Sequence, residues 1–233
     1  MTQVQTIRNH RRAARELHSG DKMPRAEFHR IYEQMPEDFK AELIGGIVYV
    51  ASPLGIEHGA NHLPLGSVLF AFEGATPGVQ SGDNATIILG EDSEPQPDLF
   101  LRIKPEYGGQ SSTTTRNFVE GPPELVAEIA YSGHSLDLHA KRRDYARYGV
   151  LEYLVLSLKE QQLKWFDLSK DRELNSDREG ICRIHAFPGL WIHVDALLQR
   201  NHQLLMSTLK SGLESPEHTR FVQKLAAARR KKK

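Results

Sequence analysis

The chain has 233 residues and 30 basic and 30 acidic side chains, so its formal net charge is zero. This length suits one large domain or one domain with appendages, and an apolar content of 39% excludes a wholly disordered or collagen-like chain. No apolar run could span a membrane, and the Arg-rich N-terminus lacks the apolar segment of a secretory signal, so we expect a soluble, cytoplasmic protein. The single cysteine, Cys182, excludes an internal disulfide and a cysteine-based zinc site.

The zero net charge conceals a segregation of charge along the chain. Residues 1–30 carry a net charge of +4, residues 31–130 of −11 and residues 131–233 of +7. Such segregation can reflect an acidic pocket for a cation beside basic surfaces for a polyanion. It can equally reflect acidic residues in solvated loops, so charge alone assigns no partner.

The first half of the chain predicts helices and short strands. Gly45-Gly46 separates two β-rich segments and suits the positive-φ positions of a tight turn, so we expect a hairpin over 41–50. Pro64 is an unfavourable residue within a predicted helix at 56–73. The other elements expected here are a helix at 24–35, strands at 85–89 and 97–103, and a long loop at 107–117.

The second half predicts a strand–helix–strand unit. Residues 124–131 form a nearly continuous apolar run, which is typical of a strand covered on both faces. A helix over 136–148 should end at Gly149 and lead into a buried strand at 151–158, so the two strands should be parallel. Further elements are expected as strands at 161–167 and 181–187, and as helices after Pro188-Gly189 and after Ser215-Pro216.

Three charged residues stand where a core should be apolar. Asp98 begins a strand, Glu128 lies inside the most apolar strand, and Lys141 lies on the helix that follows. An uncompensated buried carboxylate costs several kcal/mol, so two of them in apolar strands need a cation or another partner. Two carboxylates with a carbonyl and waters suit Mg²⁺.

Each of these residues has a second interpretation. Asp98 could cap a turn after Pro97, and Glu128 could form a buried ion pair. Lys141 could be a solvated helix residue, with Arg142 and Arg143 competing for the same role.

Six segments, in order along the chain, resemble the Uma-two family of restriction endonucleases, within the PD-(D/E)XK nuclease superfamily. They read AELIGGIVYVASP, IEHG, PDLF, ELVAEIAYS, KRRDYARYGVLEYLVL and PGLWIHV. The resemblance implies an α/β, restriction-endonuclease-like fold over residues 24–199, with a central mixed β-sheet flanked by helices. Residues 1–23 would be a basic N-terminal arm and residues 200–233 a helical, basic C-terminal extension. The implied activity is metal-dependent endonucleolytic cleavage of DNA.

The resemblance also implies site residues. Asp98 and Glu128 would ligate Mg²⁺ or Mn²⁺, and Lys141 would orient the attacking water and offset negative charge. Glu42 would approach the metal indirectly, and His58 would assist with phosphate or water. The superfamily's usual lysine lies two residues after the second acid, where this chain has alanine, so that role moves to Lys141, as in many family members.

Three alternatives stay open. The main one is a nuclease-fold protein that binds DNA or a protein partner without cutting. The segment around Ser135 has the context of a nucleophile elbow, but Asp137 replaces its final glycine. His58 and His62 have a metal-like spacing without the glutamate of a zincin motif, which predicts histidines on the helix surface.

Proteins of restriction-endonuclease-like fold often form homodimers, and the sequence shows no interface for one.

The two tryptophans and the C-terminal basic run have structural interpretations as well. Trp165 and Trp191 lie in apolar strand contexts, which predicts core residues rather than platforms for stacked bases. The basic run from Arg220 to Lys233 contains no acid and suits phosphate contacts. A solvated terminal helix would have the same composition.

Overall fold

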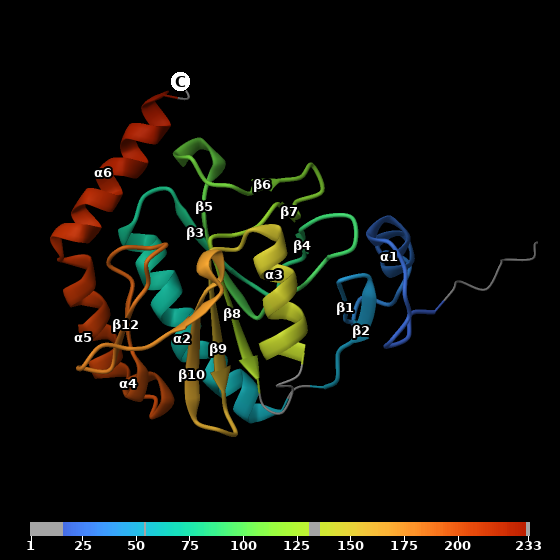
Figure 1. Cartoon of the computed structure of the whole chain (residues 1–233), viewed down its shortest axis with the longest axis horizontal. Helices are drawn as coiled ribbons and strands as arrows, with labels where there is room; N and C mark the ends of the chain where they lie inside the picture. The colour runs from blue at the N-terminus through green and yellow to red at the C-terminus, as the bar shows by residue number, and fades with distance from the viewer. Residues whose placement is uncertain (1–15, 54, 131–135, 232–233) are drawn as a thin grey trace, which may run out of the picture.

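The structure is a computed structural model of the chain and describes residues 16–53, 55–130 and 136–231 (Figure 1). Most of the predicted basic arm and Ser135 of the possible nucleophile elbow lie outside these residues.

A six-stranded mixed sheet forms the centre of the molecule. In spatial order its strands are β11 (Arg172–Leu174), β10 (Gln162–Asp167), β9 (Glu152–Ser157), β8 (Leu125–Ala130), β5 (Leu99–Ile103) and β3 (Val79–Asp83). β8 and β9 are parallel, and the other neighbours are antiparallel. Every residue of β8 and β9 is buried, so the predicted pair of parallel strands covered on both faces is confirmed.

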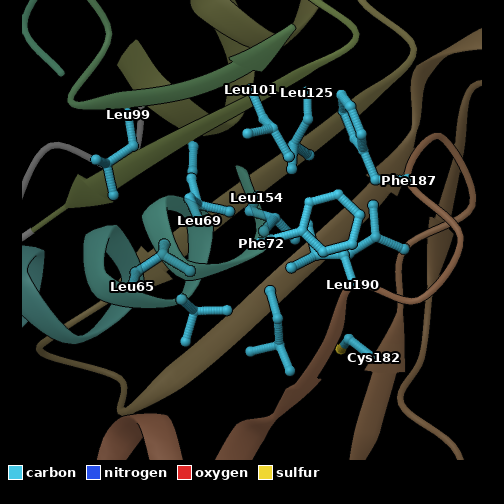
Figure 2. Packing of buried hydrophobic residues seen from close by; sticks show 14 of the residues in the cluster. Leu65, Leu69, Phe72, Leu99, Leu101, Leu125, Leu154, Cys182, Phe187 and Leu190 are labelled. Atoms are coloured by element: carbon cyan, nitrogen blue, oxygen red, sulfur yellow. The ribbon is translucent and has the colours of Figure 1, made fainter. Parts of the chain in front are cut away.

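Four helices contribute to the core on one face of the sheet; the first two contact its strands, and the third packs against those two. They are α2 (Ile56–Ala75), α4 (Val194–Leu198), α5 (His202–Leu213) and α6 (Pro216–Lys231). In Figure 2, Leu69 and Phe72 of α2 lie beside Leu154 of the sheet, in a cluster that also holds Leu65 and Leu101. Since α5 and α6 also bury apolar side chains in this core, the C-terminal extension packs onto the domain.

The other face of the sheet packs against α3 (Arg142–Tyr148). Val126 and Tyr153 of the sheet are buried in one cluster with Tyr145 of α3. A π-helical turn, η2 (Leu136–Lys141), leads into α3, and Gly149 ends it with a φ of 92°, as predicted. Side chains alternate along β8, so Glu128 points to the same face as Val126.

The N-terminal part forms a smaller layer with its own core. It comprises α1 (Arg25–Tyr32) and the antiparallel hairpin of β1 (Ala41–Ile44) and β2 (Ile47–Val50). Gly45 and Gly46 have φ values of 56° and 78°, which confirms the predicted glycine turn. A backbone bridge between Leu43 and Glu94 ties the hairpin to the rest of the domain.

Short strands and turns complete the fold. They are β4 (Ile87–Ile88), β6 (Ser112–Thr113) and β7 (Val119–Glu120) in one sheet, β12 (Ile181–Arg183) and β13 (Trp191–His193) in another, and the 3₁₀ turns η1 (Pro105–Tyr107) and η3 (Leu168–Lys170). The predicted strand at 85–89 thus shrinks to two residues outside the central sheet. No helix in the described ranges combines the length and apolarity needed to cross a membrane.

Two expectations after residue 180 are wrong. The strand expected over 181–187 ends at Arg183, and a strand, not a helix, follows Pro188-Gly189. β12 pairs antiparallel with β13, so the intervening residues must reverse the chain, and Gly189 does this with a φ of 92°. Trp165 is buried as predicted, whereas Trp191 is half-buried beneath the guanidinium of Arg183.

Candidate active site

Asp98 and Glu128 meet where β5 begins, although 30 residues separate them. β5 and β8 are antiparallel with Leu99 opposite Ala127, so the next positions along, Asp98 and Glu128, are also neighbours. The Asp98 backbone nitrogen lies 3.4 Å from Glu128 Oε2, and the Ile129 N–H donates to Asp98 Oδ2 at 2.7 Å. Sheet register therefore brings both carboxylates to one place.

Lys141 joins this pair to a third carboxylate. Its Nζ lies 2.9 Å from Glu128 Oε1 and 2.9 Å from Glu42 Oε2. The lysine is only 5% exposed, so the reading of Lys141 as a solvated helix residue is wrong. Arg142 instead lies over the Phe166 ring at 4.4 Å. The buried ion pair that the sequence allowed for Glu128 is present, and it is shared with Glu42.

His58 and His62 approach Asp98 from the first turns of α2. His58 Nε2 lies 3.3 Å from Asp98 Oδ2, and His62 Nε2 donates to the Asp98 backbone oxygen at 2.9 Å. Both histidines are half-buried, so their predicted place on the helix surface is wrong. The four-residue spacing puts both rings on the side of α2 that faces the beginning of β5.

The pKa of Asp98 is lowered by its neighbours. Burial raises this pKa, but the hydrogen bonds from His58 and from the Ile129 N–H, with the charges of His58 and Lys141, outweigh burial. Asp98 is therefore ionised at neutral pH. The acidic side chains of Glu42, Asp98 and Glu128 outnumber the one lysine beside them, and such a surplus of acidic groups favours a cation.

Three contributors were not predicted from the sequence. Tyr145 donates from its hydroxyl to Glu128 Oε1 at 2.9 Å, and the Gln96 N–H donates to Glu42 Oε1 at 2.6 Å. Burial raises the pKa of Tyr145 well above its usual value, so the phenol keeps its proton. The third is His62. Tyr145 and His62 each lie four residues beyond a candidate residue on the same helix, and this spacing was the available signal.

The donor chemistry suits a hard divalent cation. Among the described residues, no group of three or more His, Cys, Asp or Glu side chains is arranged to hold a metal ion. Mg²⁺ does not need such a group, because it commonly binds one or two carboxylates, keeps several waters and contacts substrate phosphates. Asp98 and Glu128 supply this sparse set of oxygen donors.

Comparisons with known proteins agree with this fold. A family model described as "Putative restriction endonuclease", Uma2, matches residues 25–195. A crystal structure of a "putative nuclease belonging to DUF820" from Anabaena variabilis superimposes with a TM-score of 0.59 at 14% identity, covering 73% of this chain and 96% of that one. A search of curated proteins finds no match. Because the family model spans most of the sequence, the chain belongs to the Uma2 family of restriction-endonuclease-like proteins.

Proposed function

We propose that this protein is a metal-dependent endonuclease that hydrolyses DNA phosphodiester bonds at the cluster of Glu42, Asp98, Glu128 and Lys141. One observation carries the proposal: these side chains come from four separate segments and converge at the place where β5 begins. Two of them, Glu128 and Lys141, are almost inaccessible to solvent. The description of the Uma2 family supports the choice of reaction.

Each residue has a chemical task in this proposal. Asp98 and Glu128 would hold Mg²⁺ or Mn²⁺, which when bound would acidify a water and polarise the phosphodiester. Lys141 would orient the attacking water and offset negative charge as it develops. His58, beside Asp98, is placed to exchange a proton with water or phosphate.

Support for a DNA substrate is indirect. The family description names restriction endonucleases, and the sequence adds the basic segment from Arg220 to Lys231 on the exposed side of α6. Lysine and arginine side chains of this kind contact phosphates without reading bases. The cytoplasmic location expected from the sequence stays a prediction.

A second function has an observation in its favour. Lys141 already pairs with both Glu42 and Glu128, and Tyr145 donates to Glu128. This network compensates buried charge without a metal, as a structural ion pair would. It favours a protein of nuclease fold that binds DNA or a protein partner without cutting.

Plasmid cleavage separates the two functions. Supercoiled plasmid is incubated with wild type in Mg²⁺, in Mn²⁺ and in chelator, and nicked and linear products are measured. Asp98→Asn removes a carboxylate charge at nearly constant volume. Asp177→Asn is the matched control, because Asp177 also accepts backbone N–H donors, from Glu179 and Ile181, but lies in the exposed segment before β12.

The endonuclease predicts nicking that requires the metal, is lost in Asp98→Asn and persists in Asp177→Asn. Cleavage that survives Asp98→Asn would remove the proposed site. Metal-independent plasmid binding without nicking by wild type would favour the second function.

A further inference from the structure

The outer face of α2 carries a line of large apolar side chains in solvent. Ile56, Leu63 and Phe70 are 86%, 68% and 71% exposed, and they are three of the four exposed large hydrophobic residues in the described ranges. They are seven residues apart, which is close to two helical turns, so they lie on one stripe. Exposed apolar residues scattered singly need no explanation, but three in a line indicate a contact surface.

The stripe lies opposite the buried side of α2. Leu65, Val68, Leu69 and Phe72 face the sheet and are fully buried. The stripe is therefore not an edge of the domain core. Figure 1 shows α2 running across its face of the sheet as one long helix.

Small residues alternate with the large ones along this face. Ala60, Ser67 and Gly74 lie between or beyond the large residues, and a Cβ added at Gly74 would meet nothing within 4 Å. The face carries no charged side chain, because Glu57 and Glu73 point to the flanks of the helix. A second helix can therefore approach it closely and without like-charge repulsion.

We infer that this stripe is the interface of a homodimer in which two α2 helices pack antiparallel. A two-fold axis at the level of residue 65 puts Ile56 opposite the partner subunit's Gly74. The same axis puts Leu63 opposite the partner subunit's Ser67, and Phe70 opposite the partner subunit's Ala60. Each large side chain then meets a small residue, which is the self-complementarity that an isologous interface requires.

The area available is close to what a stable dimer needs. The three side chains expose on the order of 400 Å², so a two-fold pair buries on the order of 800 Å² before the flanking residues are counted. Specific interfaces bury at least about 1,000 Å² in total. The three large side chains alone supply most of this area, whereas a small ligand could not cover a line about four turns long.

The dimer would also fix the distance between two candidate sites. His58 lies seven residues from the proposed axis, so the two copies of His58 would be about 21 Å apart along the helices. Such a dimer would place two sites to act on one DNA duplex, and only this consequence rests on the proposed function. The dimer itself is independent of catalysis.

Sedimentation velocity of the full chain at micromolar concentration tests the interface. Wild type should sediment as a dimer, and Leu63→Glu should raise the dimer dissociation constant at least about thirtyfold, as expected for a residue at the centre of an interface. Ala227→Glu is the matched control, since it places the same charge on an exposed position of α6 and should leave the dimer intact. Far-ultraviolet circular dichroism checks that each variant is folded, and Phe70→Glu replaces Leu63→Glu if the latter is not.

Disulfide trapping tests the antiparallel arrangement. The native cysteine, Cys182, is buried, so introduced cysteines dominate cross-linking. The double variant Ile56→Cys/Gly74→Cys should give a covalent dimer under mild oxidation. Ile56→Cys alone should not, because its two copies would be about 27 Å apart along the helices.

Three results would overturn the inference. They are a monomeric wild type, a dimer that Leu63→Glu leaves unchanged, and a covalent dimer from Ile56→Cys alone, which would indicate parallel helices. None of these results depends on whether the protein cuts DNA, so failure of the dimer and failure of the proposed function are distinguishable.

Discussion

Glu128 and Glu152 stand on the neighbouring parallel strands β8 and β9, both are almost fully buried, and they are held by different kinds of neighbour. Glu128 contacts the Lys141 ammonium and the Tyr145 hydroxyl and lies beside Asp98. Glu152 accepts hydrogen bonds from the Trp165 indole at 2.8 Å and from the Ala186 N–H at 2.6 Å. Burial raises the pKa of Glu152, although these hydrogen bonds and His185 partly oppose the rise.

The difference separates a candidate site from a structural carboxylate. Glu152 accepts from the Trp165 indole and the Ala186 N–H, has His185 3.7 Å away, and ties β9 to the segment after β12. Glu128 shares its cation with Glu42 and lies next to another ionised acid, so the group has spare negative charge. A buried acid in a strand is therefore a weak sign of function, whereas several acids around one lysine are a stronger one.

Replacing Glu128 or Glu152 with glutamine should give the largest difference in nicking rate between two variants. Glu128→Gln should lower the rate of plasmid nicking by roughly two orders of magnitude or more, because it removes a metal ligand. Glu152→Gln should leave the nicking rate within about threefold of wild type and lower the free energy of unfolding by about 1–3 kcal/mol, because one buried donor loses its acceptor. Equal losses of cleavage in the two variants would erase the distinction.

Removing the shared cation should have the largest effect on stability. Lys141→Met leaves the buried Glu128 and the half-buried Glu42 without their ammonium partner, so the free energy of unfolding at pH 7 should fall by about 3–5 kcal/mol in urea denaturation. Adding Glu128→Gln to Lys141→Met should recover part of this loss, because one uncompensated charge disappears. A strictly additive double variant would show that the two residues are not coupled.

Tyr145→Phe should have a smaller effect. It removes one hydrogen bond to an ionised carboxylate, so the free energy of unfolding should fall by about 1.5–3 kcal/mol. Nicking should slow by about tenfold if the phenol positions Glu128, and its metal-concentration dependence should shift to higher Mg²⁺. Unchanged metal dependence would mean that Tyr145 only packs.

The smallest expected effect is on the pH dependence of stability, where Asp98 and Glu152 should act in opposite directions. Asp98 has a lowered pKa, so its contribution is present above its ordinary value of 3.8 and is lost as the pH falls through the lowered value. Glu152 has a raised pKa, so its ionisation weakens the fold as the pH rises from 4.5 toward the raised value.

Urea denaturation between pH 3 and pH 7 measures how the free energy of unfolding changes with pH. Asp98→Asn should reduce the loss of this free energy at acid pH. Glu152→Gln should remove the decline in this free energy above pH 4.5. A steeper loss of stability in acid for Asp98→Asn, or a steeper decline above pH 4.5 for Glu152→Gln, would contradict the directions of these pKa shifts.

Strong local signals made much of the fold predictable. The apolar run of β8, the glycine at the end of α3 and the paired glycines of the first hairpin each have a direct conformational consequence. β3 was missed because its sequence, VQSGD, has little strand propensity and forms only as the partner of β5. The strand over 181–187 was overestimated because its pairing with β13 ends it at Arg183.

The candidate site was predictable in its acids but not in its hydrogen bonds. Asp98, Glu128 and Lys141 stood out because charge is rare in buried positions, and the resemblance added Glu42 and His58. The contacts of Tyr145 and His62 depend on how α3 and α2 are rotated against the sheet, which the sequence pattern does not specify. Glu152 carried the same sequence signal as Glu128 and was not singled out, so burial of charge alone does not identify a site.

Anomalous diffraction from a crystal grown with Mn²⁺ and a short DNA duplex would show whether Asp98 and Glu128 bind a metal ion. The proposed endonuclease should give a Mn²⁺ peak about 2.0–2.3 Å from oxygens of both Asp98 and Glu128, with a phosphate oxygen completing the coordination. A cluster without Mn²⁺, in which Lys141 still pairs with Glu42 and Glu128 while DNA is bound elsewhere, would contradict it.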